Sequence, residues 1–218
     1  MTISGTRREE GTLHTAMTIR GFVKASTVDE IVDLLRDPQV ATDYDLRAVL
    51  YRATSKRFGD DPLAAPVYIA LTRDSDPALR AIAARKLGVT GGDGAFEALA
   101  SVADDADEGA RNLAVAALAT VDPGESITIA EHALTDESAL VRGSACKVLG
   151  AAGDPSSVAP LKKALADSTG RVRGKAATAL AAIGTADAAE ALLSAADGAR
   201  VMDRLIFKDQ ARQVRERL

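Results

Sequence analysis

Two stretches of the sequence nearly repeat one another: ALVRGSACKVLGAAGD at residues 139–154 and, 31 residues further on, GRVRGKAATALAAIGT at residues 170–185. Aligning the whole chain on the arginine at the fourth position of these stretches places five arginines 31 or 33 residues apart: Arg47, Arg80, Arg111, Arg142 and Arg173. Self-similarity at such a period is typical of a repeat array, in which each unit buries its apolar face against its neighbours. The chain is therefore expected to consist of stacked copies of one supersecondary unit.

Apolar residues keep fixed distances from each of these arginines. The positions one before and three after it are apolar in all five copies, and the position seven after it is leucine in four of them. Steps of four residues return to the same side of an α-helix, so each arginine lies in the first turn of an amphipathic helix. We call these the arginine helices.

Glycines and prolines predict where the helices end and bend. We expect the arginine helices to end at Gly59, Gly88, Gly150 and Gly184, because glycine tolerates the left-handed backbone of a helix C-terminus. A second helical pattern precedes several arginine helices, and we call these segments the partner helices; they are predicted at residues 62–74, 94–104 and 155–167. Pro66 and Pro160 fall inside two of them and are expected to bend them.

An aspartate stands six residues before the arginine in four copies, giving the pairs Asp74 and Arg80, Asp105 and Arg111, Asp136 and Arg142, and Asp167 and Arg173. An acid that ends one helix and a base in the first turn of the next can pair within a unit or between stacked units. Partly desolvated ion pairs fix register more than they add stability. We therefore interpret these residues as a structural ladder along the inter-helix turns and not as a row of catalytic carboxylates.

Composition sets limits on the class of protein. Aromatic residues make up only 3% of the 218 residues and tryptophan is absent, which favours closely packed helices over strands. The single cysteine, Cys146, cannot form an intramolecular disulfide; with no signal-peptide pattern and no apolar run near the roughly 20 residues of a membrane span, we expect a cytoplasmic protein. The net charge of −4 argues against general nucleic-acid binding.

The ends of the chain depart from the repeat. Residues 1–26 are expected to form a disordered tail, in which Met17 could be the translation start, and residues 27–218 form the repeat domain. Thr27 and Glu30 have the spacing of a capping box for a first helix. A closing helix after residue 199 is predicted to face the last repeat through four apolar residues: Val201, Leu205, Val214 and Leu218.

The unit Asp-x5-Arg, with an apolar residue before the arginine and an Ala-rich helix ending Leu-Gly after it, resembles HEAT repeats. More narrowly it resembles the short HEAT-like repeats named after phycobilisome lyases, over about residues 41–197. The resemblance implies an all-α fold, namely an α-α superhelix (a HEAT-like α-solenoid) of about five to six antiparallel helix pairs. It also implies that the superhelix is right-handed and that the arginine helices line its concave side.

No residue pattern demands a chemical reaction, and no cofactor is predicted. Relatives with this repeat include di-iron deoxyhypusine hydroxylases with recurring His-Glu dipeptides, but this chain has only His14 and His132, so we expect no metal site. Cys146 has small apolar neighbours and is interpreted as a packed thiol, and the glycine-rich residues 90–94 as a turn. Bilin lyases also resemble the repeat, so an enzyme subunit that handles a tetrapyrrole remains an alternative.

Helical geometry leaves the positions one, two, five and nine after each arginine pointing away from the core. The first of these columns holds Ala48, Ala81, Asn112, Gly143 and Gly174. The columns two and five after the arginine predict a groove that combines apolar and basic residues: Val49, Arg52, Ile82, Arg85, Leu113, Lys147 and Lys175. We therefore predict a non-enzymatic protein-binding scaffold or adaptor whose partner has an acidic and apolar surface. Nucleic acid on the basic concave face is a further alternative, and the sequence predicts no oligomeric state.

Overall fold

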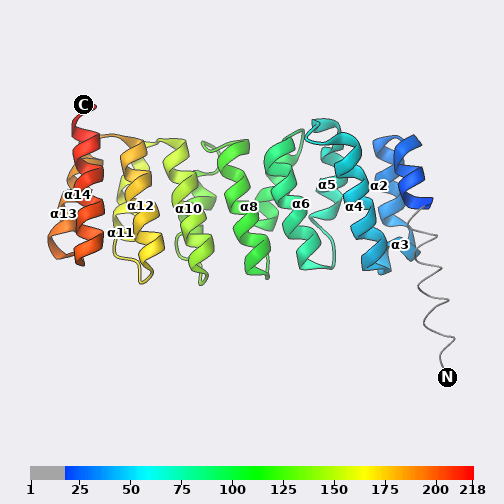
Figure 1. The fold of residues 1–218 in the computed structure, drawn as a ribbon, viewed down its shortest axis with the longest axis horizontal. Coiled ribbons are helices and arrows are strands. Elements are labelled where there is room, and N and C mark those ends of the chain that lie inside the picture. Colours follow the sequence, from blue (N-terminus) through cyan, green and yellow to red (C-terminus); the bar gives the residue numbers. More distant parts are fainter. Residues whose placement is uncertain (1–17) are drawn as a thin grey trace, which may run out of the picture.

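The computed structural model describes residues 18–218, in which all regular structure is helical (Figure 1). Six helices form one layer: α4 (Tyr44–Phe58), α6 (Pro77–Thr90), α8 (Glu108–Val121), α10 (Ala139–Ala152), α12 (Gly170–Ile183) and α14 (Val201–Arg215). The partner helices form the second layer: α2 (Val28–Arg36), α3 (Pro38–Thr42), α5 (Ala65–Leu71), α7 (Ala95–Val102), α9 (Ile127–Ala133), α11 (Val158–Ala164) and α13 (Ala186–Gly198). Each helix of these ranges is too short or too polar to cross a lipid bilayer.

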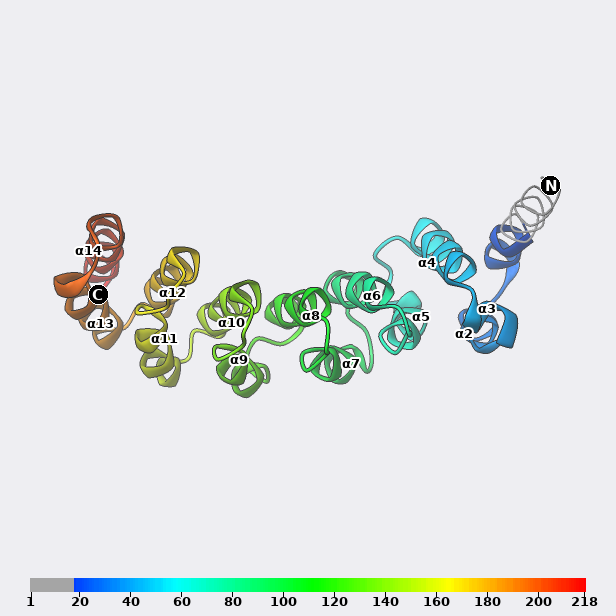
Figure 2. The same cartoon turned by 90° about the horizontal axis from the view of Figure 1, so that it is seen from below.

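The units stack in sequence order along one axis, so that the two ends of the described chain lie far apart (Figure 1). Figure 2 shows the two layers end-on, with the row from α4 to α14 on the inner side of a shallow arc. The arginine helices thus form the concave face and the partner helices the convex face. The predicted all-α superhelix of about five to six antiparallel helix pairs is confirmed.

The core lies between the two layers. The leucines seven residues after the arginine, namely Leu87, Leu118, Leu149 and Leu180, have no solvent-exposed surface, and the residues one before and three after the arginine are also buried. This matches the amphipathic pattern of the sequence. Each leucine removed from water in this way stabilises the fold by about 1.5–3 kcal/mol.

Two of the four glycines predicted to end helices have another role. Gly59 and Gly184 follow α4 and α12 with φ of 58° and 72°, as predicted, but α6 and α10 continue past Gly88 and Gly150 to Gly91 and Gly153. A Cβ on Gly88 would lie 2.6 Å from the Cβ of Ala117, and one on Gly150 would lie 2.8 Å from the Cα of Ala179. These two glycines therefore let α6 approach α8, and α10 approach α12, at backbone distance.

Pro66 and Pro160 do not bend their helices, contrary to expectation. Each partner segment opens with a short 3-10 turn, η1 (Pro62–Ala64) or η2 (Pro155–Ser157), and the α-helix begins only afterwards. Pro66 and Pro160 then stand within the first three residues of α5 and α11. In the first turn the missing N–H of proline breaks no hydrogen bond.

The N-terminal side is more ordered than predicted. Residues 18–25 are helical, although they belong to the predicted tail, and their Ile19 and Val23 are buried against the first units. The guanidinium of Arg57 in α4 donates to the backbone carbonyls of Val23 and Ser26 and so attaches this helix. The capping box of Thr27 and Glu30 is confirmed. The remainder of the predicted tail, with Met17 and His14, lies outside the described residues.

The closing helix α14 packs with a different face from the predicted one. Its buried residues are Asp203, Phe207, Ala211 and Val214, whereas Val201, Leu205 and Leu218 are exposed. Of the four predicted contacts only Val214 is confirmed. On the buried face Asp203 pairs with Arg173 of α12, at 2.8 Å.

We predict that Gly150→Ala destabilises the protein by about 1–3 kcal/mol, because its methyl group would overlap the backbone of α12. Gly174→Ala is the matched control, since Gly174 also lies inside a helix but a Cβ there would meet nothing within 4 Å. That change should instead stabilise the protein by up to about 1 kcal/mol, from helix propensity alone. Denaturant unfolding of the two variants measures the difference, and equal effects would disprove the close approach.

Candidate functional site

Five arginine–aspartate ion pairs run along the turns of the solenoid, each joining one unit to the next. The arginine Nε lies 2.6–2.8 Å from an aspartate oxygen in the pairs Arg47–Asp74, Arg80–Asp105, Arg111–Asp136 and Arg142–Asp167. The fifth pair joins Arg173 to Asp203. The predicted ladder is thus an inter-unit one, and it includes Arg47 and Asp203, which were not predicted as members.

Each arginine also bonds back to its own unit. Nη1 of Arg80, Arg111, Arg142 and Arg173 donates to the carbonyl oxygen of the aspartate six residues earlier, at 2.8–2.9 Å. In each of these aspartates, the side-chain oxygen Oδ1 accepts a hydrogen bond from the backbone N–H two residues on, as Asp105 Oδ1 does from Asp107. The guanidinium of each ladder arginine therefore holds the turn of its own unit and the aspartate of the next unit.

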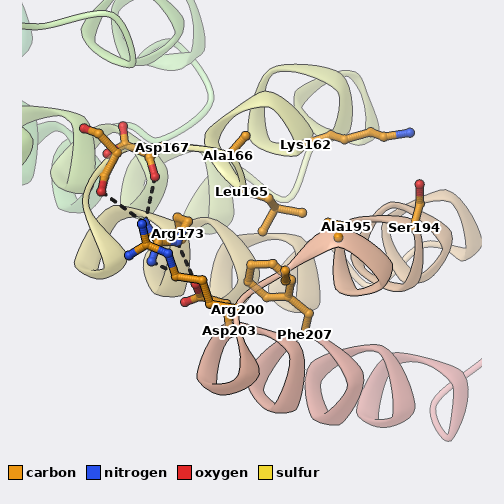
Figure 3. A pocket seen from close by; sticks show the side chains of 13 residues that line it. Lys162, Leu165, Ala166, Asp167, Arg173, Ser194, Ala195, Arg200, Asp203 and Phe207 are labelled. Carbon is orange, nitrogen blue, oxygen red and sulfur yellow. Dashed lines mark hydrogen bonds and ion pairs between the residues drawn. The ribbon is translucent and has the colours of Figure 1, made fainter.

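Asp203 completes the ladder from a different element. In the other four pairs the acid lies in the turn before an arginine helix, 25 or 27 residues after its partner arginine. Asp203 instead lies in the first turn of α14, 30 residues after Arg173. Figure 3 shows Arg173 between Asp167 and Asp203. A cavity of about 520 Å³ lies beside this pair, with Phe207 and Leu165 on its apolar side and Lys162 and Arg200 among its charged residues.

The ladder changes the acidity of its members. The hydrogen bond from Arg80 holds the pKa of Asp105 below its ordinary value, and the one from Arg142 does the same for the pKa of Asp167. For Asp136, burial raises the pKa, but the bonds from Arg111 and the Ser138 N–H outweigh it, so the pKa is lowered as well. The carboxylates are thus held ionised, which suits a structural role and not proton transfer.

Lateral packing between arginine helices buries part of the predicted groove. Val49 is only 6% exposed and belongs to the core, so its prediction as a groove residue is wrong, and Ile82 and Leu113 are half-buried. Between α8 and α10, and between α10 and α12, the second position after one arginine lies against the first position of the preceding arginine helix. Ser144 donates to Asn112 across this contact at 2.8 Å, and Lys175 covers Gly143.

The concave surface is formed by the columns two before, five after and nine after the arginine. These positions differ by four or seven residues and so share one side of the helix. The predicted Arg52, Arg85 and Lys147 are exposed there, as is the tip of Lys175, and none of the four has an ion-pair or hydrogen-bond partner among the described residues. The predicted first-position residues Ala48, Ala81 and Gly143 are instead buried.

These concave columns hold five cations and one acid. The exposed cations are Arg52, Lys56, Arg85, Lys147 and Arg171, and the acid is Asp45. Large apolar side chains accompany them: Val89 is 62% and Leu140 44% exposed. Seven of the ten exposed large apolar residues of the described chain lie on the arginine-helix layer, four of them on α14: Tyr44, Val89, Leu140, Val201, Met202, Leu205 and Ile206.

The convex layer has the opposite charge. Exposed residues of the partner helices comprise three bases, Arg36, Lys162 and Lys163, and eight acids: Asp29, Glu30, Asp33, Glu97, Glu131, Asp187, Glu190 and Asp197. The net charge of −4 therefore conceals two faces of opposite sign. Sequence reasoning identified the basic columns but not the acidic face, because the partner helices carry a less regular pattern.

A shallow apolar groove of about 340 Å³ lies on the concave side between α10 and α12. Gly150, Ala151, Ala179 and Ala182 line it, and Lys147 and Lys175 flank it. Cys146 reaches its floor but is buried, and burial raises the pKa of the thiol to about 12. This agrees with a packed thiol, since a thiolate nucleophile needs a lowered pKa.

The described residues contain no cluster of His, Cys, Asp and Glu side chains that could hold a metal ion. The side chain of His132 is 81% exposed on the convex side, with its Nδ1 3.9 Å from Asp104. The chain thus does not place His132 in a ligand set.

Comparison with protein families gives a match to the HEAT repeats family model over residues 64–139 and 127–204. The two matched segments span more than half of the chain. The protein belongs to the HEAT-repeat family. No curated protein sequence matches the chain.

Solved structures of similar fold are helical repeat proteins. A designed armadillo repeat protein in complex with the peptide (KR)4 is 19% identical, with 88% of this chain and 99% of that chain covered and a TM-score of 0.62. YibA of Escherichia coli is 18% identical over 94% and 77% of the two chains, with a TM-score of 0.61. The complex of CpcE and CpcF of phycocyanin lyase from Nostoc sp. PCC7120 is 22% identical over 99% and 89%, with a TM-score of 0.49. At these identities the likeness to the first two structures shows a helical repeat fold alone.

We predict that Asp105→Asn destabilises this HEAT-repeat protein by about 2 kcal/mol or more, because Arg80 would keep its charge without a carboxylate in a largely desolvated turn. Asp33→Asn removes an equal charge from a pair whose side chains are 75% and 73% exposed, and should cost less than about 1 kcal/mol. Free energies of unfolding in denaturant test both. A similar cost for the two variants would show that the ladder is no stronger than a surface pair.

The lowered pKa values of Asp105, Asp136 and Asp167 also predict acid sensitivity. A carboxyl group with a lowered pKa in the folded state contributes its full stability above its unfolded pKa of about 4, and loses it as the pH falls through the folded pKa. Melting temperatures should therefore drop steeply below about pH 4. The triple Asn variant should be less stable than the wild type at neutral pH, and this gap should narrow in acid; a constant gap would contradict the assignment.

Proposed function

We propose that this HEAT-repeat protein is a non-enzymatic scaffold that docks a protein segment bearing acidic and apolar side chains on its concave face. The observation that carries the proposal is the separation of charge between the layers. The concave columns present five cations to one acid, together with exposed apolar residues, while the convex layer is mainly acidic.

The concave cations are available to a partner. Among residues 18–218, Arg52, Arg85 and Lys147 have no carboxylate partner, whereas the ladder arginines are fully engaged. Unpaired cations spaced along a face attract an anionic segment at long range and raise its association rate. The acidic convex face repels the same segment, so electrostatics directs the partner to one side of the solenoid.

Apolar contacts would supply the short-range part of the affinity. Leu140 and Val89 project among the cations, and the groove between α10 and α12 has a floor of glycine and alanine. Small floor residues admit a partner side chain close to the helix backbone. A designed armadillo repeat protein of similar fold is in complex with a basic peptide, (KR)4; the mode proposed here resembles it with the charges reversed.

A displayed library of random peptides, selected on the purified protein, should yield sequences rich in Asp and Glu interspersed with apolar residues. The variant Arg52→Glu, Arg85→Glu, Lys147→Glu should weaken the binding of a selected peptide by at least about tenfold, because three attractive contacts become repulsive. Fluorescence anisotropy measures the affinity, and circular dichroism checks that helicity is retained.

The control reverses the convex bases with Lys162→Glu and Lys163→Glu, which should leave peptide affinity within about twofold. Equal loss in both variants, or unchanged affinity in the concave variant, would remove the proposal. Preference for duplex DNA with a steep salt dependence would favour the nucleic-acid alternative instead. A visible absorption band in the protein purified from its native cell would favour the tetrapyrrole alternative.

A further inference from the structure

A second basic feature lies at the N-terminal end of the solenoid, between the helix of residues 18–25 and α4. A pocket of about 590 Å³ is lined there by five cations, Arg20, Lys24, Arg52, Lys56 and Arg57, with Val23 and Ala53 as its apolar residues. No acidic side chain is among the lining residues that the structure describes. Arg52 and Lys56 also belong to the concave columns, and Arg20, Lys24 and Arg57 add three cations beside them.

Two helices of the fold hold these cations in fixed positions around the pocket. Arg20 and Lys24 are four residues apart on one helix, and Arg52 and Lys56 are four apart on α4, so each helix presents a pair on one side. Arg57 fixes the distance between the two helices, because it donates to the carbonyls of Val23 and Ser26 and stacks 4.5 Å from the centre of the Phe58 ring. The two pairs therefore face a common pocket.

The remaining four cations have no partner in the described chain. Arg20, Lys24, Arg52 and Lys56 make no ion pair or side-chain hydrogen bond among residues 18–218. Like charges held close together raise the free energy of the folded state, and a bound anion removes that cost. Since buried Val23 anchors the helix to the core, the cations cannot separate without unpacking it.

We infer that this pocket binds a small polyphosphorylated ligand, at a site that shares Arg52 and Lys56 with the proposed peptide-docking face and adds Arg20 and Lys24. Charge density favours phosphate over carboxylate. A terminal phosphate carries about −1.5 to −2 at neutral pH, so two or three phosphates balance five cations, whereas carboxylates would need about five separate groups in the same volume. Arginine guanidinium groups bind phosphate oxygens in pairs, and the apolar residues leave room for an organic part of the ligand.

Isothermal titration with inorganic tripolyphosphate and with ATP at low salt tests the inference and distinguishes a purely inorganic anion from one with an organic part. Tripolyphosphate is expected to bind one site per chain and to raise the melting temperature. The variant Arg20→Gln, Lys24→Gln should weaken this binding by at least about tenfold, while Lys162→Gln, Lys163→Gln should leave it within about twofold. Neither pair belongs to the concave columns, so peptide docking is expected to survive both changes.

Three results would overturn the inference. The first is the absence of saturable tripolyphosphate binding by the wild type at low salt, and the second is an equal loss in the α11 control variant, which would indicate general attraction of anions. The third is competition by an acidic peptide, without phosphate, that binds the pocket more tightly than tripolyphosphate. In that last case the pocket would be the end of the peptide-docking face.

Discussion

The ion pair between consecutive units is the constraint on which the rest of the structure depends. Each ladder arginine is held by a carbonyl of its own turn and by the carboxylate of the following unit, so it fixes the position of one hairpin relative to the next. Apolar packing alone would allow one hairpin to shift along the next, because contacts between Leu and Ala side chains have no directional preference. Five such pairs keep the arginine helices side by side with the same side toward the inner face of the arc.

That arrangement decides which residues a partner can reach. Once the arginine helices lie next to one another, the glycine and alanine contacts between them bury the flanking positions, as Gly88 against Ala117 and Gly150 against Ala179 show. Only a narrow row of side chains on each arginine helix remains exposed to solvent. The concave face therefore consists of one such row per unit, and specificity for a partner must come from a segment that contacts several rows.

The sequence predicted the fold and the core because the repeat period and the apolar columns record which side of a helix meets the other layer. It could not predict lateral contacts, since the burial of Val49 and the close approach of Ala117 to Gly88 depend on the distance between neighbouring helices. Asp203 escaped prediction for a related reason: it reaches Arg173 from another element, outside the Asp-x5-Arg spacing. The cations Arg52, Arg85 and Lys147 are exposed, as the helical geometry predicted, because no lateral contact covers them.

The charge of the concave face is not required by the fold. The ladder and the Leu and Ala core define the solenoid, and neutral residues in the outer columns would serve it as well. The concentration of cations on this face has a cost, which Lys175 shows. Burial, together with the nearby cations Arg171 and Lys147, lowers the pKa of its ammonium group. An anionic group that approaches this region would favour the charged lysine and relieve the repulsion. If the proposed acidic segment docks here, its binding and the stability of these units are therefore linked.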